Sequence, residues 1–413
     1  MFQRNYKRTK HSCYFSYLSM ASVFTLPPML FVTFRETYGV SYTLLGTLVL
    51  VNFCAQLCVD LTFTFFSHLF NIRKTVRIMP VLTSIGLVLY ALSPILFPNN
   101  VYLGLLFGTV IFSISAGLSE VLLSPMVASL PSDNAERDMS LLHSLYAFGV
   151  VFMVSISTVF FNLFGTHNWQ YLSLLLAVFP LITSFMFCTS PIPDINIVQN
   201  DTQTIHKNRS AGLALCSACI FFGAAAENVM TNWVSSFLES ALAISKSLGD
   251  ILGMALFAVF LGLGRILYAK YGKNISNALL LGMVGAAVCY LVAGLCSNPV
   301  ISLLSCVLTG FATSMLWPGT LILMEEKIPH AKVAAYALMA SGGDLGSSVA
   351  PQLMGYIVDT VSESTFAAKL SQTLSISTEQ IGMKTGMIVT SVFPIIGILI
   401  LLIIKRYFRT EKE

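Results

Sequence analysis

The chain has 413 residues, of which 55% are hydrophobic and 10% are charged, and its mean hydropathy is +0.78. A composition this apolar excludes an ordinary soluble globular protein. The formal net charge of +4 is small, so the basic residues are informative only through their positions. The composition therefore places the chain in a lipid bilayer.

Apolar segments long enough to cross a bilayer as a helix, which takes about 20 residues, recur along the whole sequence. The first six are 13–34, 42–69, 76–97, 101–125, 140–164 and 169–188. The last six are 211–238, 248–270, 275–297, 299–324, 333–358 and 385–405. The short alternating segments of a membrane β-barrel do not occur. The sequence thus predicts an all-α membrane protein with twelve transmembrane helices.

Basic residues are distributed unevenly between the loops on the two sides of these segments. Of the 23 Lys and Arg residues, eighteen fall on the side of both termini. The opposite side holds Arg35, Lys246, Lys369 and Lys384. Because positive residues favour the cytoplasm, we expect both termini to be cytoplasmic. The basic N-terminus is followed by an apolar run too long for a signal peptide, so we expect an uncleaved first helix.

A polar stretch from Ser190 to Ser210 separates six predicted helices from six. We expect an N-terminal six-helix half over 1–188, a cytoplasmic linker over 189–210 and a C-terminal six-helix half over 211–413. Two parallel repeats that hold a solute near the midplane are a common arrangement with this layout. The stretch 362–384 predicts an extracellular loop with a short surface helix.

Four carboxylates and one arginine lie inside the apolar segments: Asp60, Glu120, Glu227, Asp344 and Arg265. A charge at the centre of a membrane helix costs about 2.5 to 3.5 kcal/mol, so such residues normally face a polar cavity and mark an ion or solute path. We expect Glu120 to bind and release a proton. The alternatives for Glu120 are a fixed ion pair or a hydrogen bond that packs helices.

Asp60 and Asp344 lie at similar predicted depths in the second and eleventh segments. Two neighbouring buried anions repel, so one must be protonated, bind a cation or pair with Arg265. These three residues are candidates for coupling ion binding to the movement of the halves. Alternatively, the carboxylates lock the halves without titrating, and Arg265 extends to the membrane interface.

The seventh segment combines a carboxylate, two carboxamides and an indole. Such groups suit a sugar, because hydroxyls need hydrogen-bond donors and acceptors while the C–H face of the ring stacks on an aromatic side chain. The alternative is that the carboxamides and the indole serve helix packing. The predicted solute-binding residues are Glu227, Asn228, Asn232, Trp233, His143, Tyr146 and Trp317.

Several motifs in colinear order resemble the major facilitator superfamily, and in particular its fucose permease branch. They are Gly117-Leu-Ser-Glu120 with Pro125, the stretch 141–149 (LLHSLYAFG), Gly264-Arg265, Trp317-Pro318 and Gly342-Gly343-Asp344. The resemblance implies the two-half fold of that superfamily, alternating access and Glu120 as proton carrier. It also places His143 where the family often has a solute-contacting glutamine. The first segment departs from the pattern because it has no acidic residue.

We therefore expect a secondary active transporter in the plasma membrane that takes up a sugar or a similar small polar solute with protons. Its expected partners are the solute, protons or another cation, and the bilayer, with the chain acting as a monomer. No cofactor, metal or nucleic acid is expected. The motifs GxSxG, HExxH and GxxxxGK[ST] do not occur, so we do not expect an enzyme. The alternatives are a drug or metabolite exporter of the same fold and a non-transporting membrane sensor or scaffold.

Overall fold

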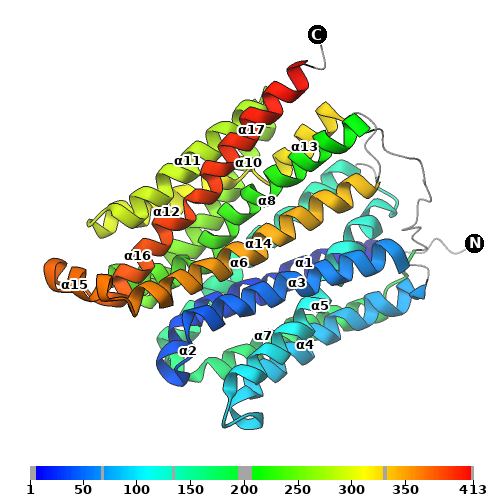
Figure 1. The fold of residues 1–413 in the computed structure, drawn as a ribbon. Coiled ribbons are helices and arrows are strands. Elements are labelled where there is room, and N and C mark those ends of the chain that lie inside the picture. The colour runs from blue at the N-terminus through cyan, green and yellow to red at the C-terminus, as the bar shows by residue number, and fades with distance from the viewer. Residues whose placement is uncertain (1–5, 67–68, 133–134, 194–206, 329–332, 411–413) are drawn as a thin grey trace, which may run out of the picture. The chain divides into compact units, whose positions relative to one another are not determined.

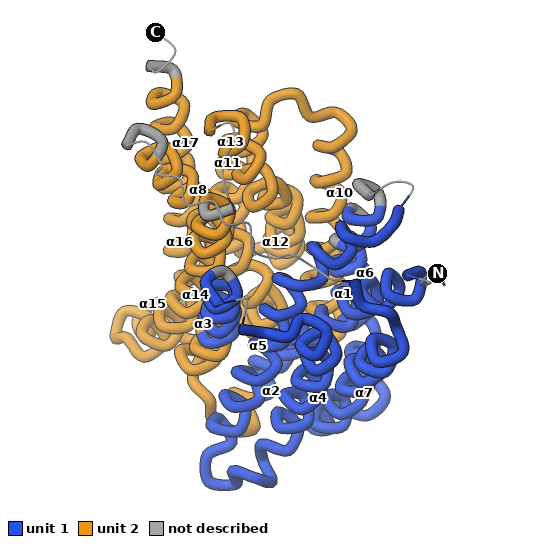
Figure 2. The backbone as a smooth tube through the Cα atoms, turned by 90° about the vertical axis from the view of Figure 1, so that its right-hand side faces the viewer, with its two compact units in different colours: residues 1–33, 51–199 blue, residues 34–50, 200–413 orange. Residues whose placement is uncertain are grey.

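The computed structural model describes residues 6–66, 69–132, 135–193, 207–328 and 333–410, and the regular elements in these ranges are all helices (Figure 1). The chain divides into two compact units, shown in Figure 2. Unit 1 consists of residues 1–33 and 51–199, and unit 2 consists of residues 34–50 and 200–413. The expected all-α fold is confirmed.

Unit 1 is a bundle of helices that pack through glycines. Its helices are α1 (Lys7–Met29), most of α3 (Tyr42–Phe66), α4 (Ile72–Leu96), α5 (Val101–Ala128), α6 (Ala135–Phe164), the 3₁₀ turn η2 (Thr166–Asn168) and α7 (Trp169–Cys188). A Cβ atom at Gly86 of α4 would lie 2.6 Å from the backbone nitrogen of Phe112 in α5. Only glycine permits two helices to approach this closely.

Unit 2 contains more, and more often interrupted, helices. They are α8 (Lys207–Ser236), the π-helical η3 (Phe237–Ala241), α9 (Lys246–Leu248), the π-helical η4 (Gly249–Ala255), α10 (Leu256–Tyr271), α11 (Ile275–Leu295), α12 (Pro299–Thr313), α13 (Pro318–Lys327), α14 (Val333–Ser362), α15 (Thr365–Leu374), α16 (Thr378–Thr390) and α17 (Val392–Thr410). Helices α8 and α14 lie side by side (Figure 1). A Cβ atom at Gly346 would lie 2.1 Å from the carbonyl oxygen of Phe221, so glycine permits this contact too.

By length and composition, ten spans among the described residues could cross a membrane, or eleven if α1 and α2 (Phe31–Tyr38) form one span bent by 46°. The bend follows Pro27 and Pro28, since proline breaks the helical hydrogen-bond ladder. Helix α14 is not among the ten although it has 30 residues. Its centre carries Gly342, Gly343 and Asp344, which lower its hydropathy.

Breaks within several of the expected segments were not predicted. The tenth segment is divided into α12 and α13 around Trp317-Pro318, and the twelfth begins earlier than expected, at Thr378. The short helix expected within 362–384 is α15. The central part of the expected linker 189–210 lies outside the described residues.

Residues 34–50, which link the first two predicted helices, pack in unit 2. The Asp359 carboxylate of α14 accepts hydrogen bonds from the backbone nitrogens of Tyr42 (3.1 Å) and Thr43 (2.6 Å), at the start of α3. Arg35 lies 3.6 Å from Asp359 and 3.6 Å from Glu379. A carboxylate at a helix N-terminus is stabilised by the free N–H groups there. This cluster therefore holds residues 34–50 in unit 2.

Candidate functional site

The clearest polar site in unit 2 is an ion pair between α8 and α10. Arg265 Nη2 lies 3.7 Å from Glu227 Oε1, and the Arg265 and Glu227 side chains are 41% and 16% exposed. The second carboxylate oxygen, Glu227 Oε2, is buried and has no hydrogen-bond partner among the described residues. A buried acceptor that is left unpaired costs free energy. The open side of Glu227 is therefore suited to a hydrogen-bond donor from outside the protein or to a proton.

A break in a neighbouring helix fixes the position of Arg265. The Arg265 Nε atom donates to the backbone carbonyl oxygen of Ser314 over 3.1 Å. Ser314 lies between α12 and α13, where Pro318, four residues further on, has no backbone N–H to donate to the Ser314 carbonyl oxygen. From the sequence alone, Asp60 and Asp344 are candidate ion-pair partners of Arg265. In the structure, Arg265 forms an ion pair with Glu227.

Carboxamides extend this polar site along α8. Asn228 Nδ2 donates to Ser347 Oγ of α14 over 2.8 Å, and also to the carbonyl oxygen of Ala224 over 3.1 Å. Asn232 Nδ2 donates to the carbonyl oxygen of Asn228 over 2.8 Å. Glu227 and Asn228 are both partly buried, whereas Asn232 is 7% exposed. Glu227 and Asn228 thus offer the more accessible polar atoms of the predicted group.

The structure places Trp233 in the packing of unit 2. It is fully buried, its Nε1 donates to the carbonyl oxygen of Pro351 over 3.0 Å, and its ring centroid lies 5.7 Å from that of Tyr42. Its indole N–H is therefore already used within the protein. A direct contact between Trp233 and a solute remains a prediction that requires local opening.

Trp317 lies in the break between α12 and α13 and is partly buried. A Cβ atom at Gly343 of α14 would lie 2.3 Å from the Trp317 ring, so glycine is needed where the indole crosses α14. The next residue, Asp344, is 7% exposed. The Gly343-Asp344 pair thus places a carboxylate beside a helix contact that admits no larger residue.

In unit 1, the candidate proton carrier Glu120 lies in the C-terminal third of α5. The Glu120 side chain is exposed on the surface of the unit. Tyr17 of α1 interacts electrostatically with Glu120, and the Tyr17 hydroxyl lies 3.2 Å from Ser124 Oγ, one turn further along α5. Glu120 is therefore exposed on the unit, and the Tyr17 hydroxyl contacts the same helix one turn further on.

Residues outside the predicted set form a buried polar network in the same unit. Asn52 Oδ1 accepts from Ser113 Oγ over 2.6 Å and from Gln56 Nε2 over 3.1 Å. Asn52, Gln56 and Asp60 are spaced four residues apart, so they lie along one face of α3. Asp60 itself is partly buried. This four-residue spacing of polar residues is the signal that could have identified the network from sequence.

A second unpredicted cluster lies at the η3 and η4 turns of unit 2. Asp250 is fully buried and accepts a 2.5 Å hydrogen bond from Ser235 Oγ, and its other oxygen lies 3.5 Å from Lys246 Nζ. Lys246 also lies 3.8 Å from Glu239. The i,i+4 spacing of Lys246 and Asp250 is the local signal that could have identified this pair. The contacts with Ser235 and Glu239 have no such signal, because the π-helical turns shift the helix register.

Two of the remaining candidates are placed less fully. Tyr146 of α6 is partly buried, and its ring lies edge-on to Phe24 with centroids 5.7 Å apart. His143 is also in α6, and its side chain lies outside the described residues. Asp60 belongs to unit 1 and Asp344 to unit 2, so their expected proximity stays a prediction.

Residues 13–351 match the sequence pattern of the Major Facilitator Superfamily. The chain belongs to this superfamily. The predicted superfamily is thereby confirmed, and the protein is a multi-pass membrane protein with a transporter fold. No curated protein matches the chain in sequence.

Solved structures of other superfamily members share this fold. A bacterial homolog to the human lysosomal transporter Spinster has a TM-score of 0.78 at 14% identity, covering 99% of this chain and 98% of that one. The xylose transporter XylE from E. coli has a TM-score of 0.72 at 15% identity, covering 93% and 94%. The nucleoside transporter NupG has a TM-score of 0.69 at 13% identity, covering 96% and 99%. At these identities the likeness shows the fold alone.

Proposed function

We propose that this superfamily member takes up a sugar or a similar small polar solute together with protons. The observation that carries the proposal is the ion pair of Glu227 and Arg265 with its unpaired buried oxygen. A hydroxyl-rich solute supplies the donors that Glu227 Oε2 lacks, and it can accept from the guanidinium. The structurally similar XylE is a xylose transporter, which supports this solute class.

Around the ion pair, Asn228 and Ser347 supply further polar atoms. Their hydrogen bond joins α8 to α14, and an amide can exchange such a bond for one to a solute hydroxyl. We include Asn232 and Trp317 in the proposed site as residues that shape it. The roles of His143, Tyr146 and Trp233 in contacting solute stay part of the proposal.

For the proton, we propose that Glu120 is the carrier. It is the acidic residue of the α5 span, its side chain is exposed, and it interacts electrostatically with Tyr17. Asp60, Asp344 and Arg265 are proposed to couple ion binding to the alternating movement. We further propose that the chain acts as a monomer in the plasma membrane with both termini in the cytoplasm.

Solute binding to the purified protein tests the proposed site. We expect a sugar or polyol to raise the thermal unfolding temperature of the wild type in a screen that also contains nucleosides, amino acids and lipophilic cations. Glu227→Gln should abolish that rise. Glu363→Gln serves as the control, because Glu363 is exposed and lies outside the site.

Two results would refute the proposed site: a response to lipophilic cations alone, which favours an exporter, or an equal response to the sugar in Glu227→Gln and the control. A wild type that responds to no solute and moves none into vesicles would favour a sensor or scaffold.

A further inference from the structure

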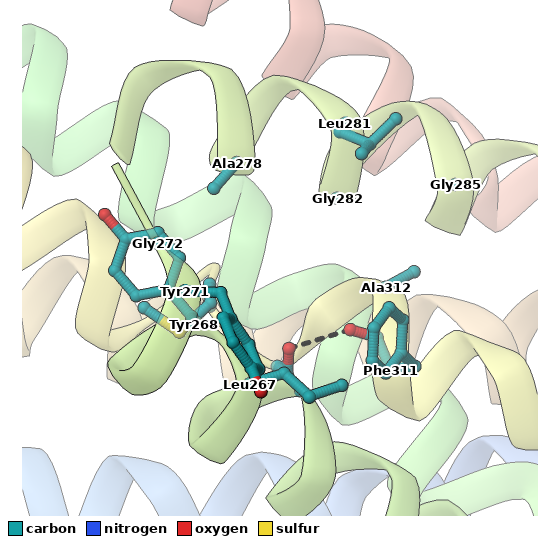
Figure 3. Close-up of a pocket in the computed structure, with 13 residues that line it drawn as sticks. Leu267, Tyr268, Tyr271, Gly272, Ala278, Leu281, Gly282, Gly285, Phe311 and Ala312 are labelled. Carbon is teal, nitrogen blue, oxygen red and sulfur yellow. Dashed lines mark hydrogen bonds between the residues drawn. The ribbon is translucent and has the colours of Figure 1, made fainter. Parts of the chain in front are cut away.

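A groove on unit 2 borders the break that holds Arg265, because Ser314 lines it and also accepts a hydrogen bond from Arg265. Neither Arg265 nor Glu227 lines the groove, and the proposed transport assigns it no role. It has a volume of about 410 Å³ and is formed by the ends of α10, α11 and α12 that lie near the 272–274 turn (Figure 3). This volume is within the range of about 300 to 1,000 Å³ that is usual for small-molecule sites. The lining residues are Gly264, Leu267, Tyr268, Tyr271, Gly272, Ala278, Leu281, Gly282, Gly285, Phe311, Ala312, Ser314 and Met315.

Small residues make the groove. Gly282 and Gly285 of α11 leave its wall without side chains, and the Ala278 methyl group points into the space above the two tyrosines (Figure 3). A Cβ atom at Gly282 would lie 2.6 Å from the carbonyl oxygen of Ala312 in α12. Helices α11 and α12 are therefore in close contact at the base of the groove, and the side chains that line it are mostly apolar.

The groove runs from the membrane interface toward the midplane. Helices α10 and α11 are both candidate spans, and the turn 272–274 joins them. From Gly272 to Gly285 the lining extends over about three turns of α11, or roughly 15 Å at about 1.5 Å per residue, which is about half of the hydrocarbon thickness. Tyr271 is 63% exposed at its outer end, as is usual for aromatic residues at the interface. These dimensions match one acyl chain of a single leaflet.

Basic side chains surround the interfacial end of the groove. Lys270 Nζ lies 5.2 Å from the centre of the Tyr271 ring, and Lys273 is exposed in the same turn. From α17, Lys405 Nζ donates to Asn277 Oδ1 over 2.8 Å, one residue before Ala278. One acidic residue, Glu326 of α13, interacts with Tyr268. The three lysines and Glu326 together carry a net positive charge, so these described residues favour an anion at the rim.

We propose that this groove binds an anionic phospholipid, with one acyl chain along α11 and the phosphate at the lysine rim. An apolar channel open at the interface excludes a soluble polar ligand, and the positive rim favours a negative headgroup over a zwitterionic one. Each lysine near a membrane surface contributes about 1 kcal/mol of attraction to anionic lipid. In the proposed orientation the rim lies on the cytoplasmic side, where anionic lipids are enriched.

Native mass spectrometry of the detergent-purified chain tests this proposal. The probes are palmitoyl-oleoyl phosphatidylglycerol, phosphatidylcholine with the same chains, and inorganic phosphate. Ala278→Phe fills the groove from an existing side chain, and its control is Val288→Phe, since Val288 is exposed on the same helix and does not line the groove. We expect the wild type to bind phosphatidylglycerol, and Ala278→Phe to bind it with about tenfold lower affinity. Val288→Phe should bind phosphatidylglycerol as tightly as the wild type does.

The headgroup is tested separately. Lys270→Gln with Lys273→Gln should weaken phosphatidylglycerol binding by about fivefold for each lysine, with little change for phosphatidylcholine. The control is Arg73→Gln with Lys74→Gln, which removes the same charge from the first turn of α4 in unit 1. Because Lys270 and Lys273 are exposed, we expect their substitution to leave the fold intact. This pair of substitutions therefore tests the proposal even if Ala278→Phe does not fold.

Three results would overturn the proposal. These are equal retention of both lipids by the wild type, equal losses in the two charge-removal pairs, and phosphatidylglycerol retention that Ala278→Phe leaves unchanged. A fourth result that would contradict the proposal is displacement of the lipid by inorganic phosphate alone, which would assign the lysines to a phosphate site.

Discussion

The ion pair in the middle of unit 2 gives the sharpest energetic prediction. Removing either charge leaves the other without an ion-pair partner among the described residues. At the 3.7 Å separation of Glu227 and Arg265, two unit charges attract by about 4 to 5 kcal/mol at an effective dielectric constant of about 20. Desolvation offsets much of this attraction. Because the Arg265 side chain is 41% exposed, we expect a net coupling of about 1 to 2 kcal/mol, within the usual range for contacting residues.

A double-mutant cycle measures this coupling. The free energies of unfolding of the wild type, Glu227→Gln, Arg265→Gln and the double variant are obtained by titration with sodium dodecyl sulfate in mixed micelles. The double variant should lose less free energy of unfolding than the sum of the losses in the two single variants, and the difference should be about 1 to 2 kcal/mol. The control cycle pairs Glu227→Gln with Lys270→Gln. Lys270 lies on α10, like Arg265, but its side chain is exposed.

The control cycle should be additive within about 0.3 to 0.5 kcal/mol. If the Glu227 and Arg265 cycle is equally additive, the two side chains do not form an energetically significant pair. The account of an anchored arginine and a carboxylate with one open oxygen would then be wrong.

Three further changes test other contacts. Trp233→Phe should lower the free energy of unfolding by about 1 to 3 kcal/mol, because the Pro351 carbonyl loses a buried donor. A free energy of unfolding equal to that of the wild type would contradict this hydrogen bond. Asp359→Asn should cost about 1 kcal/mol by weakening the cap at the start of α3 and should speed amide hydrogen exchange in residues 39–50, and unaltered exchange there would contradict the cap. The hydrogen bond from Lys10 lowers the pKa of Asp138, so the stability that this hydrogen bond contributes is present at neutral pH and is lost as the pH falls below about 4. The unfolding temperatures at pH 7 and pH 3 should therefore differ more in the wild type than in Asp138→Asn. Equal differences in the two proteins would refute the assignment.

The helical fold is largely predictable from sequence, because apolar runs of membrane length have few alternatives in a bilayer. Each expected segment coincides with a helix or with a pair of helices. The internal breaks are harder to predict. Pro318 marks the break between α12 and α13, whereas the π-helical turns around Asp250 have no comparable local signal, since they depend on how neighbouring helices pack.

For the candidate site, residue type is easier to predict than partner. The sequence identifies Glu227 and Arg265 as intramembrane charges, but it does not show that they face each other, because helix rotation is set by packing against other helices. Trp233 illustrates the same limit. Its position among carboxamides suggests a solute contact, yet its indole donates to a carbonyl oxygen of α14. Polar side chains in a membrane helix serve packing or solute according to which neighbour they meet.

Uptake of the solute into proteoliposomes under an imposed pH gradient tests the central claim most directly. The wild type should accumulate the solute that binds in the thermal screen only when the outside is acidic, with protons entering alongside it. Glu120→Gln should bind the solute and exchange it at equilibrium but should no longer accumulate it. Accumulation by the wild type that ignores the gradient, or accumulation that persists in Glu120→Gln, would contradict proton-coupled uptake through this residue.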